Sequence, residues 1–314
     1  MTQYKIAANM EWTSKCNARC VMCPQELIQK PQLMSEDTFH KTLQRLSTED
    51  LFRVVIAGYG EPTTHPKFNQ FIDAVGEHPL RFDMASNGQE LSEEKLKHLD
   101  GKLGLLLISF SSIDPDVYAN VHVKLDQQRV MRNIKLAQKT LKHTALGISL
   151  TPMASCLDTL PQTIEWLQQQ GVKLLTMSPT LYDRGGTMQH ELSTQRLRKM
   201  IKQYQLHSQE LDFIPSLRDS VAQLRQNKFR CVPRNSDLFI AASGDYLYCY
   251  NDITHQHTIG HINSDSVRDI IKQRERMAPI EGLCSDCSMR DRYGVKEIVQ
   301  VTGNYLRGKI FNAA

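Results

Sequence analysis

The stretch Lys5-Ile-Ala-Ala-Asn-Met-Glu-Trp-Thr-Ser-Lys-Cys16-Asn-Ala-Arg-Cys20-Val-Met-Cys23-Pro24 runs from an apolar segment into three closely spaced cysteines. The apolar part predicts a first strand over residues 5–11, and the cysteines follow on one short loop with the spacing C-x3-C-x2-C. Three thiolates can hold three irons of a [4Fe–4S] cube and leave the fourth iron open to a small molecule. The alternative is a structural zinc site, although no fourth ligand lies nearby in the sequence.

Apolar strands and amphipathic helices alternate through the first 190 residues. Further strands are expected over residues 53–57, 80–85, 103–110, 145–150 and 172–177, with helices over 35–47, 66–75, 92–99, 130–140 and 160–170. Alternation of this kind predicts an α/β fold in which helices cover a parallel sheet. It fits a curled (β/α)6 partial TIM barrel, in which the chemistry takes place at the C-terminal ends of the strands.

Together these features resemble the radical S-adenosylmethionine (SAM) superfamily, whose signature is this cysteine spacing close to the N-terminus. The resemblance implies that Cys16, Cys20 and Cys23 hold a [4Fe–4S] cluster whose open iron chelates the amine and carboxylate of SAM. It further implies reductive cleavage of SAM to a 5′-deoxyadenosyl radical, with a flavodoxin- or ferredoxin-type protein as the electron donor. The fold that it implies is the same partial barrel.

The segment Gly58-Tyr-Gly-Glu-Pro62 follows the second expected strand. Two glycines let a backbone approach a ligand closely, although a tight turn would also use them. The segment is similar to the G-G-E-P motif of the family, whose backbone and acid meet the SAM amino group. The resemblance therefore assigns Gly58, Gly60 and Glu61 to SAM binding.

Polar residues also follow the third and fourth expected strands. Ser86 and Asn87 occupy the place where the family puts a polar residue against the SAM ribose, although a turn would favour the same residue types. Ser109, Ser111 and Asp114 resemble an S-x-D stretch of the family that faces SAM or substrate. The alternative for this stretch is a cap on the next helix.

Asp183 and Arg184 follow the sixth expected strand. Many family members with a cysteine-rich C-terminal extension carry a similar Asn-Arg-Gly-Gly stretch at this place. The resemblance assigns Arg184 to the SAM carboxylate or the substrate and makes Asp183 a candidate catalytic residue. The alternative is a surface ion pair of little energetic weight.

A second set of cysteines lies near the C-terminus: Cys231, Cys249, Cys284 and Cys287. Four thiolates suit either zinc or a fully ligated [4Fe–4S] cluster. Between them the sequence predicts a β-hairpin over residues 239–249 with Ser-Gly-Asp at its turn, and a helix over 267–276. The arrangement resembles the twitch domain of radical SAM enzymes, the one-cluster short form of the SPASM domain, which implies a second, auxiliary [4Fe–4S] cluster.

The eighth cysteine, Cys156, lies just past the fifth expected strand. It is either a small buried apolar residue or a thiol that donates a hydrogen atom, as in radical SAM epimerases. A dehydrogenase would need no such thiol, because the electron would pass to the second cluster and a base would take the proton. Candidate bases are Asp183, Asp158, His122 and His190.

The expected domains are a partial barrel over residues 1–190, a helical linker over 191–230, a small hairpin-and-helix iron–sulfur domain over 231–290 and a tail over 291–314. The net charge of +4, from 38 basic and 34 acidic residues, argues against a nucleic-acid partner. It therefore also argues against a third hypothesis, a zinc-stabilised nucleic-acid-binding protein. No signal region or membrane span is expected, and eight cysteines without such a signal predict metal or redox chemistry in the cytoplasm.

The leading hypothesis is a radical enzyme that abstracts hydrogen from an unactivated C–H bond and epimerises its substrate with Cys156 as hydrogen donor. The alternative is oxidation of a secondary alcohol with the auxiliary cluster as electron acceptor, and an alternative of another class is a non-catalytic metal-binding protein. Only fifteen residues precede Cys16, too few for a leader-recognition domain. We therefore expect a small molecule, such as a sugar or aminocyclitol, or a short peptide as substrate.

Overall fold

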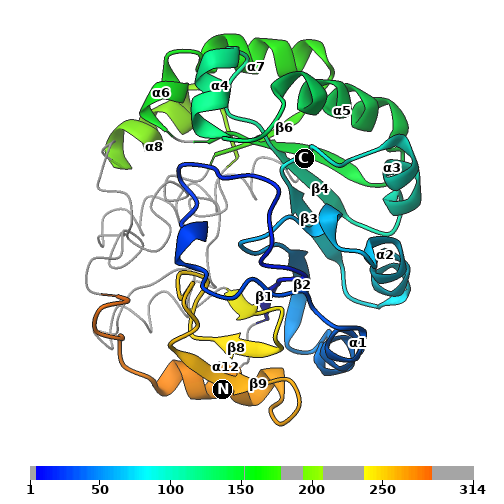
Figure 1. Cartoon of the computed structure of the whole chain (residues 1–314), viewed down its shortest axis with the longest axis vertical. Helices are drawn as coiled ribbons and strands as arrows, with labels where there is room; N and C mark the ends of the chain where they lie inside the picture. The colour runs from blue at the N-terminus through cyan, green and yellow to red at the C-terminus, as the bar shows by residue number, and fades with distance from the viewer. Residues whose placement is uncertain (1–4, 152, 178–193, 208–236, 285–314) are drawn as a thin grey trace, which may run out of the picture.

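The computed structural model describes residues 5–151, 153–177, 194–207 and 237–284, with only the backbone of residues 194–198 (Figure 1). Within these ranges one curved sheet runs through the chain in the strand order β6-β5-β4-β3-β2-β1-β7-β8-β9. The first six strands are β1 (Ile6–Met10), β2 (Leu51–Ile56), β3 (Phe82–Ser86), β4 (Leu105–Ser109), β5 (Ala145–Ser149) and β6 (Leu174–Thr176). Each pairs in parallel with its successor, which confirms the partial TIM barrel.

Helices cover the outer side of this sheet, as Figure 1 shows. They are α1 (Glu36–Arg45), α2 (Phe68–Glu77), α3 (Glu93–Leu99), α4 (Pro115–Val121), α5 (Gln127–Thr140), α6 (Ala154–Leu157), α7 (Leu160–Gln169) and α8 (Thr194–Gln203), with short 3-10 turns η1 (Gln25–Leu27) and η2 (Pro62–Thr64). Ser35 and Ser92 begin α1 and α3, and each hydroxyl accepts a backbone N–H three residues on. The two short helices α4 and α6 were not expected from the sequence.

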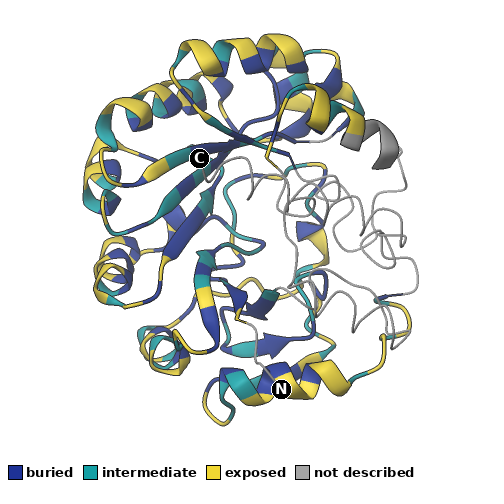
Figure 2. Cartoon of the chain, turned by 180° about the vertical axis from the view of Figure 1, so that it is seen from behind, coloured by how far each residue is buried: buried dark blue, intermediate teal, exposed yellow. Residues whose placement is uncertain are grey.

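The core lies between the sheet and the helices, where Figure 2 shows buried strands and helices whose exposed faces point outward. Trp12, directly after β1, is 1% exposed and meets the rings of Phe39, Phe68 and Phe71 edge-on. Such aromatic contacts add to the stabilisation that burial itself provides. They anchor the start of the cysteine loop to α1 and α2.

The predicted C-terminal hairpin is present, and it continues the barrel sheet. It consists of β7 (Asp237–Ile240) and β8 (Asp245–Leu247), followed by β9 (Thr258–His261) and by α12 (Val267–Arg276), the helix expected over the same residues. Gly244, at a φ of +94°, makes the turn, where a side chain would be strained. Because β7 pairs in parallel with β1, the hairpin lies beside the strand that leads into the cysteine loop.

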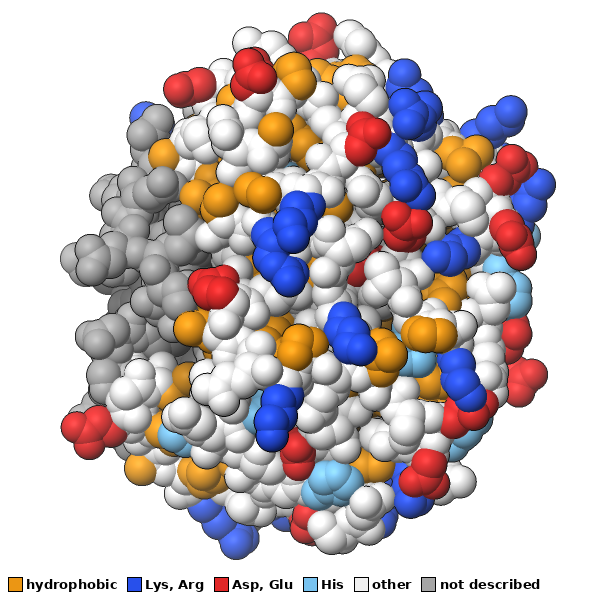
Figure 3. Space-filling model, in the orientation of Figure 1, with side chains coloured by type: hydrophobic (Ala, Val, Ile, Leu, Met, Phe, Trp, Pro, Cys, Tyr) orange, Lys and Arg blue, Asp and Glu red, His pale blue; other side chains and the backbone are white. Residues whose placement is uncertain are grey.

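The described surface is mixed in charge. On the face drawn in Figure 3, basic and acidic side chains are interspersed with apolar and uncharged ones. No helix within the described ranges is long and apolar enough to cross a membrane. The boundaries between the expected domains, the linker over 191–230 and the tail over 291–314 fall wholly or partly outside the described residues and stay predictions.

Candidate functional site

The cysteine loop begins after β1 and is fastened by backbone hydrogen bonds to the end of α4. The Arg19 N–H donates to the Val123 carbonyl over 2.9 Å, and the Val21 N–H donates to the Val121 carbonyl over 3.0 Å. The N–H of Cys23 closes a turn onto the carbonyl of Cys20. Residues about a hundred positions apart therefore share the support of this loop, which fixes the backbone that carries the thiols.

The thiols of the loop lie close enough to influence one another. Burial raises the pKa of Cys16 to about 11 and that of Cys20 to about 12, and the negative charges of Cys23 and Glu61 act in the same direction. Bare thiolates are therefore disfavoured here, whereas a positively charged metal group would compensate them. Three thiols that share one partly buried loop fit a [4Fe–4S] cluster, in which each cysteine binds a different iron.

Within the described ranges, no three His, Cys, Asp or Glu side chains converge as ligands of one metal ion. Half of the predicted second cysteine set falls in those ranges. Cys249 follows β8, where its sulfur accepts the Asn251 N–H over 3.3 Å, and Cys284 is buried after α12. Cys231 and Cys287 lie outside the described residues, as do Asp183, Arg184 and His190.

Glu61 is the centre of a buried network at the ends of β2 and β3. One carboxylate oxygen accepts the backbone N–H of Thr63 at 3.1 Å, the hydroxyl of Thr63 at 2.6 Å and that of Ser86 at 2.8 Å. The other oxygen accepts the Asn87 N–H over 2.7 Å. Burial raises the pKa of Glu61, and these hydrogen bonds oppose that rise. The carboxylate thus ties two strand ends together.

Asn87 connects this network to the cysteine loop. Its side-chain amide donates to the side-chain oxygen Oδ1 of Asn17 at 2.7 Å and lies 3.9 Å from the sulfur of Cys16. The structure therefore brings Asn87, Glu61 and Ser86 together with a predicted cluster ligand. Asn17 was not predicted, and its own amide nitrogen is buried without a hydrogen-bond partner among the described residues.

Gly58 and Gly60 have a packing role within the chain. A Cβ on Gly58 would lie 2.5 Å from the Glu11 side chain, and one on Gly60 would lie 2.2 Å from the carbonyl oxygen of Thr13. Real Cβ atoms essentially never come closer than 3.0 Å. The two glycines therefore seat this segment against β1 and the cysteine loop, and their predicted contact with SAM stays a prediction.

Glu11 is a buried acid that the sequence analysis missed. Its carboxylate accepts the Tyr59 N–H at 2.8 Å and the Ala242 N–H at 3.4 Å, so it joins segments from β1, β2 and β7. Burial raises its pKa, and the two backbone donors oppose the rise. The signal for it was a charged residue at the end of an apolar strand.

The ends of β4 and β5 hold the remaining predicted polar residues. Ser109 is half-buried and pairs with Ser149 of β5. The Ser111 hydroxyl is buried without a partner among the described residues. Asp114 accepts the N–H groups of Asp116 and Val117 and thereby caps α4, a helix that the sequence did not predict.

Cys156 lies on α6, after β5, where it is 1% exposed and packed in the apolar core. Two candidate bases fall within the described residues, of which Asp158 is exposed beside α6. The other, His122, is fully buried at the end of α4, and its Nδ1 lies 3.3 Å from the Cys20 sulfur. Burial lowers the pKa of His122 to about 4.

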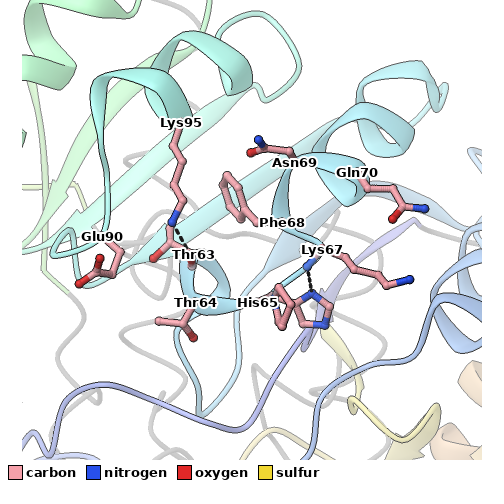
Figure 4. Close-up of a pocket in the computed structure, with 10 residues that line it drawn as sticks. Thr63, Thr64, His65, Lys67, Phe68, Asn69, Gln70, Glu90 and Lys95 are labelled. Atoms are coloured by element: carbon pink, nitrogen blue, oxygen red, sulfur yellow. Dashed lines mark hydrogen bonds between the residues drawn. The ribbon is translucent and has the colours of Figure 1, made fainter.

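A separate groove of about 620 Å³ is lined by residues of η2, of the start of α2 and of the start of α3. Figure 4 shows Lys95 donating to the Thr63 carbonyl and the Lys67 N–H donating to His65 at this place. None of the predicted cofactor residues lines this groove. It is therefore distinct from the site built by the cysteine loop and the strand ends.

A family model described as the Radical SAM superfamily matches residues 10–167, about half of the chain. The chain belongs to the radical SAM superfamily. Membership makes it a radical SAM enzyme and brings SAM and a [4Fe–4S] cluster as cofactors. The matched range holds the cysteine loop and the Glu61–Asn87 network.

The chain is also similar in sequence to a curated protein and shares its fold with solved structures. The tungsten-containing aldehyde ferredoxin oxidoreductase cofactor-modifying protein of Pyrococcus furiosus is 22% identical over 311 residues, covering 90% of this chain and 87% of that protein. BtrN in complex with AdoMet and 2-DOIA shares the fold with a TM-score of 0.54 and 17% identity, over 92% of this chain and 94% of that chain. Streptococcus suis SuiB bound to S-adenosylmethionine shares the fold with a TM-score of 0.63 and 12% identity, over 86% of this chain and 64% of SuiB.

Proposed function

We propose that this radical SAM enzyme abstracts a hydrogen atom from an unactivated C–H bond of a small molecule or a short peptide. The observation that best supports this proposal is the partly buried cysteine loop, which lies beside the Glu61–Asn87 network at the C-terminal strand ends. When bound, the cluster and SAM together supply the 5′-deoxyadenosyl radical. Cys16, Cys20 and Cys23 hold the cluster, and the strand ends hold SAM.

Each residue of the strand ends has a defined task in this proposal. Glu61 fixes the relative position of β2 and β3 through its buried hydrogen bonds, so that Asn87 keeps its amide beside Cys16. Asn87 and Ser86 meet the SAM ribose, and the segment from Gly58 to Glu61 meets the SAM amino group. Fixed donors of this kind need no reorganisation when SAM reacts.

For the fate of the substrate we propose epimerisation, with Cys156 as the hydrogen donor. Its support is the place of Cys156 on α6, the helix that follows β5, at the same end of the sheet as the cysteine loop. In this step the S–H bond breaks and a C–H bond forms on the opposite face of the substrate carbon. One electron from the donor protein and one proton from solvent then restore the thiol.

A second candidate is oxidation of a secondary alcohol, and the hairpin favours it. Cys23 packs against an apolar cluster that includes Tyr59, Phe239 and Leu247, so β7 and β8 border the cysteine loop. An auxiliary cluster on Cys231, Cys249, Cys284 and Cys287 would be carried by the same hairpin region. The substrate carbon would lose a second electron to this cluster and a proton to a base such as Asp183.

The proposed partners follow from the same reasoning. The Pyrococcus furiosus relative is named for modifying a cofactor, which supports a small-molecule substrate. A flavodoxin- or ferredoxin-type protein in the cytoplasm would supply the electron, and Arg184 would meet the SAM carboxylate or the substrate. We propose no nucleic-acid partner, because the net charge of +4 is low.

Products formed in D2O distinguish the two fates. Reconstituted enzyme is incubated with SAM, reductant and a panel of sugars, aminocyclitols and short peptides, and products are analysed by mass spectrometry and NMR. Epimerisation predicts an inverted product carrying one deuterium with the wild type, and none with Cys156→Ala, which still cleaves SAM. A product lacking two hydrogens, formed equally by both proteins, contradicts epimerisation and supports oxidation.

A further inference from the structure

A buried histidine touches one of the cluster cysteines. His122 Nδ1 lies 3.3 Å from the Cys20 sulfur, although the two residues are 102 positions apart in the chain. His122 is 1% exposed, and its ring packs at 4.8 Å from the ring of Tyr118. The end of α4 also holds the loop backbone through the Val21-to-Val121 hydrogen bond. The contact thus belongs to a firmly supported part of the loop.

The chemistry of the pair fixes the direction of the hydrogen bond. A thiolate that ligates iron can only accept, so the histidine nitrogen that faces it must carry the proton. A distance of 3.3 Å is normal for a nitrogen donor and a sulfur acceptor. The remaining ring nitrogen, Nε2, has no hydrogen-bond partner among the described residues. The proton therefore has one partner within reach, the Cys20 sulfur.

The surroundings strengthen such a bond. Tyr118 is fully buried, and its hydroxyl also has no partner among the described residues. In this apolar setting a hydrogen bond to a charged sulfur is stronger than it would be in water. It withdraws electron density from the thiolate, and hydrogen bonds to the sulfurs are among the features that set the reduction potential of an iron–sulfur cluster.

We propose that His122 is a positioning residue that donates its Nδ1–H to the Cys20 sulfur and thereby raises the reduction potential of the cluster. The proposal rests on the function proposed above in requiring the cluster on Cys16, Cys20 and Cys23. His122 acts through the ligand and holds no iron. Its effect is to make the cluster easier to reduce by the electron donor.

The test is EPR-monitored potentiometry of the anaerobically reconstituted protein, following the cluster whose spectrum changes when SAM is added. His122→Phe keeps a ring but removes the donor, and we expect a midpoint potential lower by about 59 mV, a tenfold change for one electron. His122→Asn places an amide N–H near the position of Nδ1 and should restore most of the difference. His78→Phe is the matched control. His78 is half-buried and precedes the N-terminal end of β3, whereas the cysteine loop lies at the C-terminal strand ends, so this substitution should leave the reduction potential unchanged.

Unchanged potential in His122→Phe overturns the proposal while leaving the radical SAM assignment intact. Absence of any SAM-sensitive cluster signal in the wild type overturns both. If His122→Phe assembles no cluster, the test is made on the wild type. Pulsed EPR of protein with ¹⁵N-labelled histidine should then show a weak coupling between a histidine nitrogen and the reduced cluster. A missing coupling, or one as large as that of a direct iron ligand, overturns the hydrogen-bond role.

Discussion

Replacing Gly60 by alanine should displace the cysteine loop. The new Cβ would lie 2.2 Å from the Thr13 carbonyl oxygen and 2.4 Å from that of Lys15, both of them backbone atoms that cannot rotate away. Ordinary contact begins at 3.4 Å, so the loop must retreat by about 1 Å. That movement also breaks the 2.9 Å hydrogen bond from the Glu61 N–H to the Lys15 carbonyl.

The cost follows from the two effects together. Overpacking of this kind costs about 1–3 kcal/mol, and the lost hydrogen bond adds about 1 kcal/mol. We therefore expect the free energy of unfolding of Gly60→Ala to fall by about 2–4 kcal/mol in urea titrations of the apoprotein. A 1 Å misplacement near reacting groups can cost about 100-fold in rate, so 5′-deoxyadenosine formation from SAM should fall by about that factor.

Gly76→Ala is the matched control. Gly76 lies in α2, where a new Cβ would lie 2.7 Å from the Cγ and 2.9 Å from the Cβ of Lys102, so a side chain far from the cysteine loop must move, and alanine favours a helix by about 1 kcal/mol. The loss of stability should be smaller than in Gly60→Ala, and SAM cleavage should be unchanged in this variant. Wild-type stability together with wild-type SAM cleavage in Gly60→Ala would refute the packing role of this glycine.

Three further predictions address other parts of the site. Glu61→Gln replaces one carboxylate oxygen by an NH2 group, which cannot accept a hydrogen bond from Thr63, Ser86 or Asn87. The free energy of unfolding should therefore fall by about 1.5–3 kcal/mol at pH 7, and an unchanged urea midpoint would argue against the network. Burial holds the pKa of His122 at about 4 in the folded apoprotein, below its ordinary value of 6.5. The free energy of unfolding should therefore fall by about 3 kcal/mol as the pH falls from 6.5 to 4. His122→Phe should lose this part of the pH dependence in urea titrations, and an unaltered profile would contradict it. Cys249→Ala should lower the iron content from about eight to about four per chain, and unchanged iron would exclude Cys249 as a ligand.

The barrel was predictable because local signals agree along the chain. Most parallel strands are short apolar runs followed by a glycine or a polar residue, and residues 53–57 and 103–110 show this clearly. The helices α4 and α6 were missed because one or two turns are too short to display a helical period. The pairing of β7 with β1 could not be inferred either, because the neighbour of a sheet edge depends on contacts between distant segments.

The site likewise has residues that local sequence patterns predict and contacts that only the tertiary structure reveals. The cysteine spacing and the residues at the strand ends are local patterns, and in the structure Cys16, Glu61, Ser86 and Asn87 lie together. The contact between His122 and its cysteine is a tertiary one, for which no local signal exists. Such partners appear only when the packing of α4 against the cysteine loop is known.

The central claim is that the three-cysteine loop supports reductive cleavage of SAM. The most direct measurement is 5′-deoxyadenosine release by anaerobically reconstituted protein with SAM and dithionite, compared with the Cys16→Ala variant. We expect 5′-deoxyadenosine from the wild type and none from the variant. No nucleoside from the wild type, or equal amounts from both proteins, would contradict it.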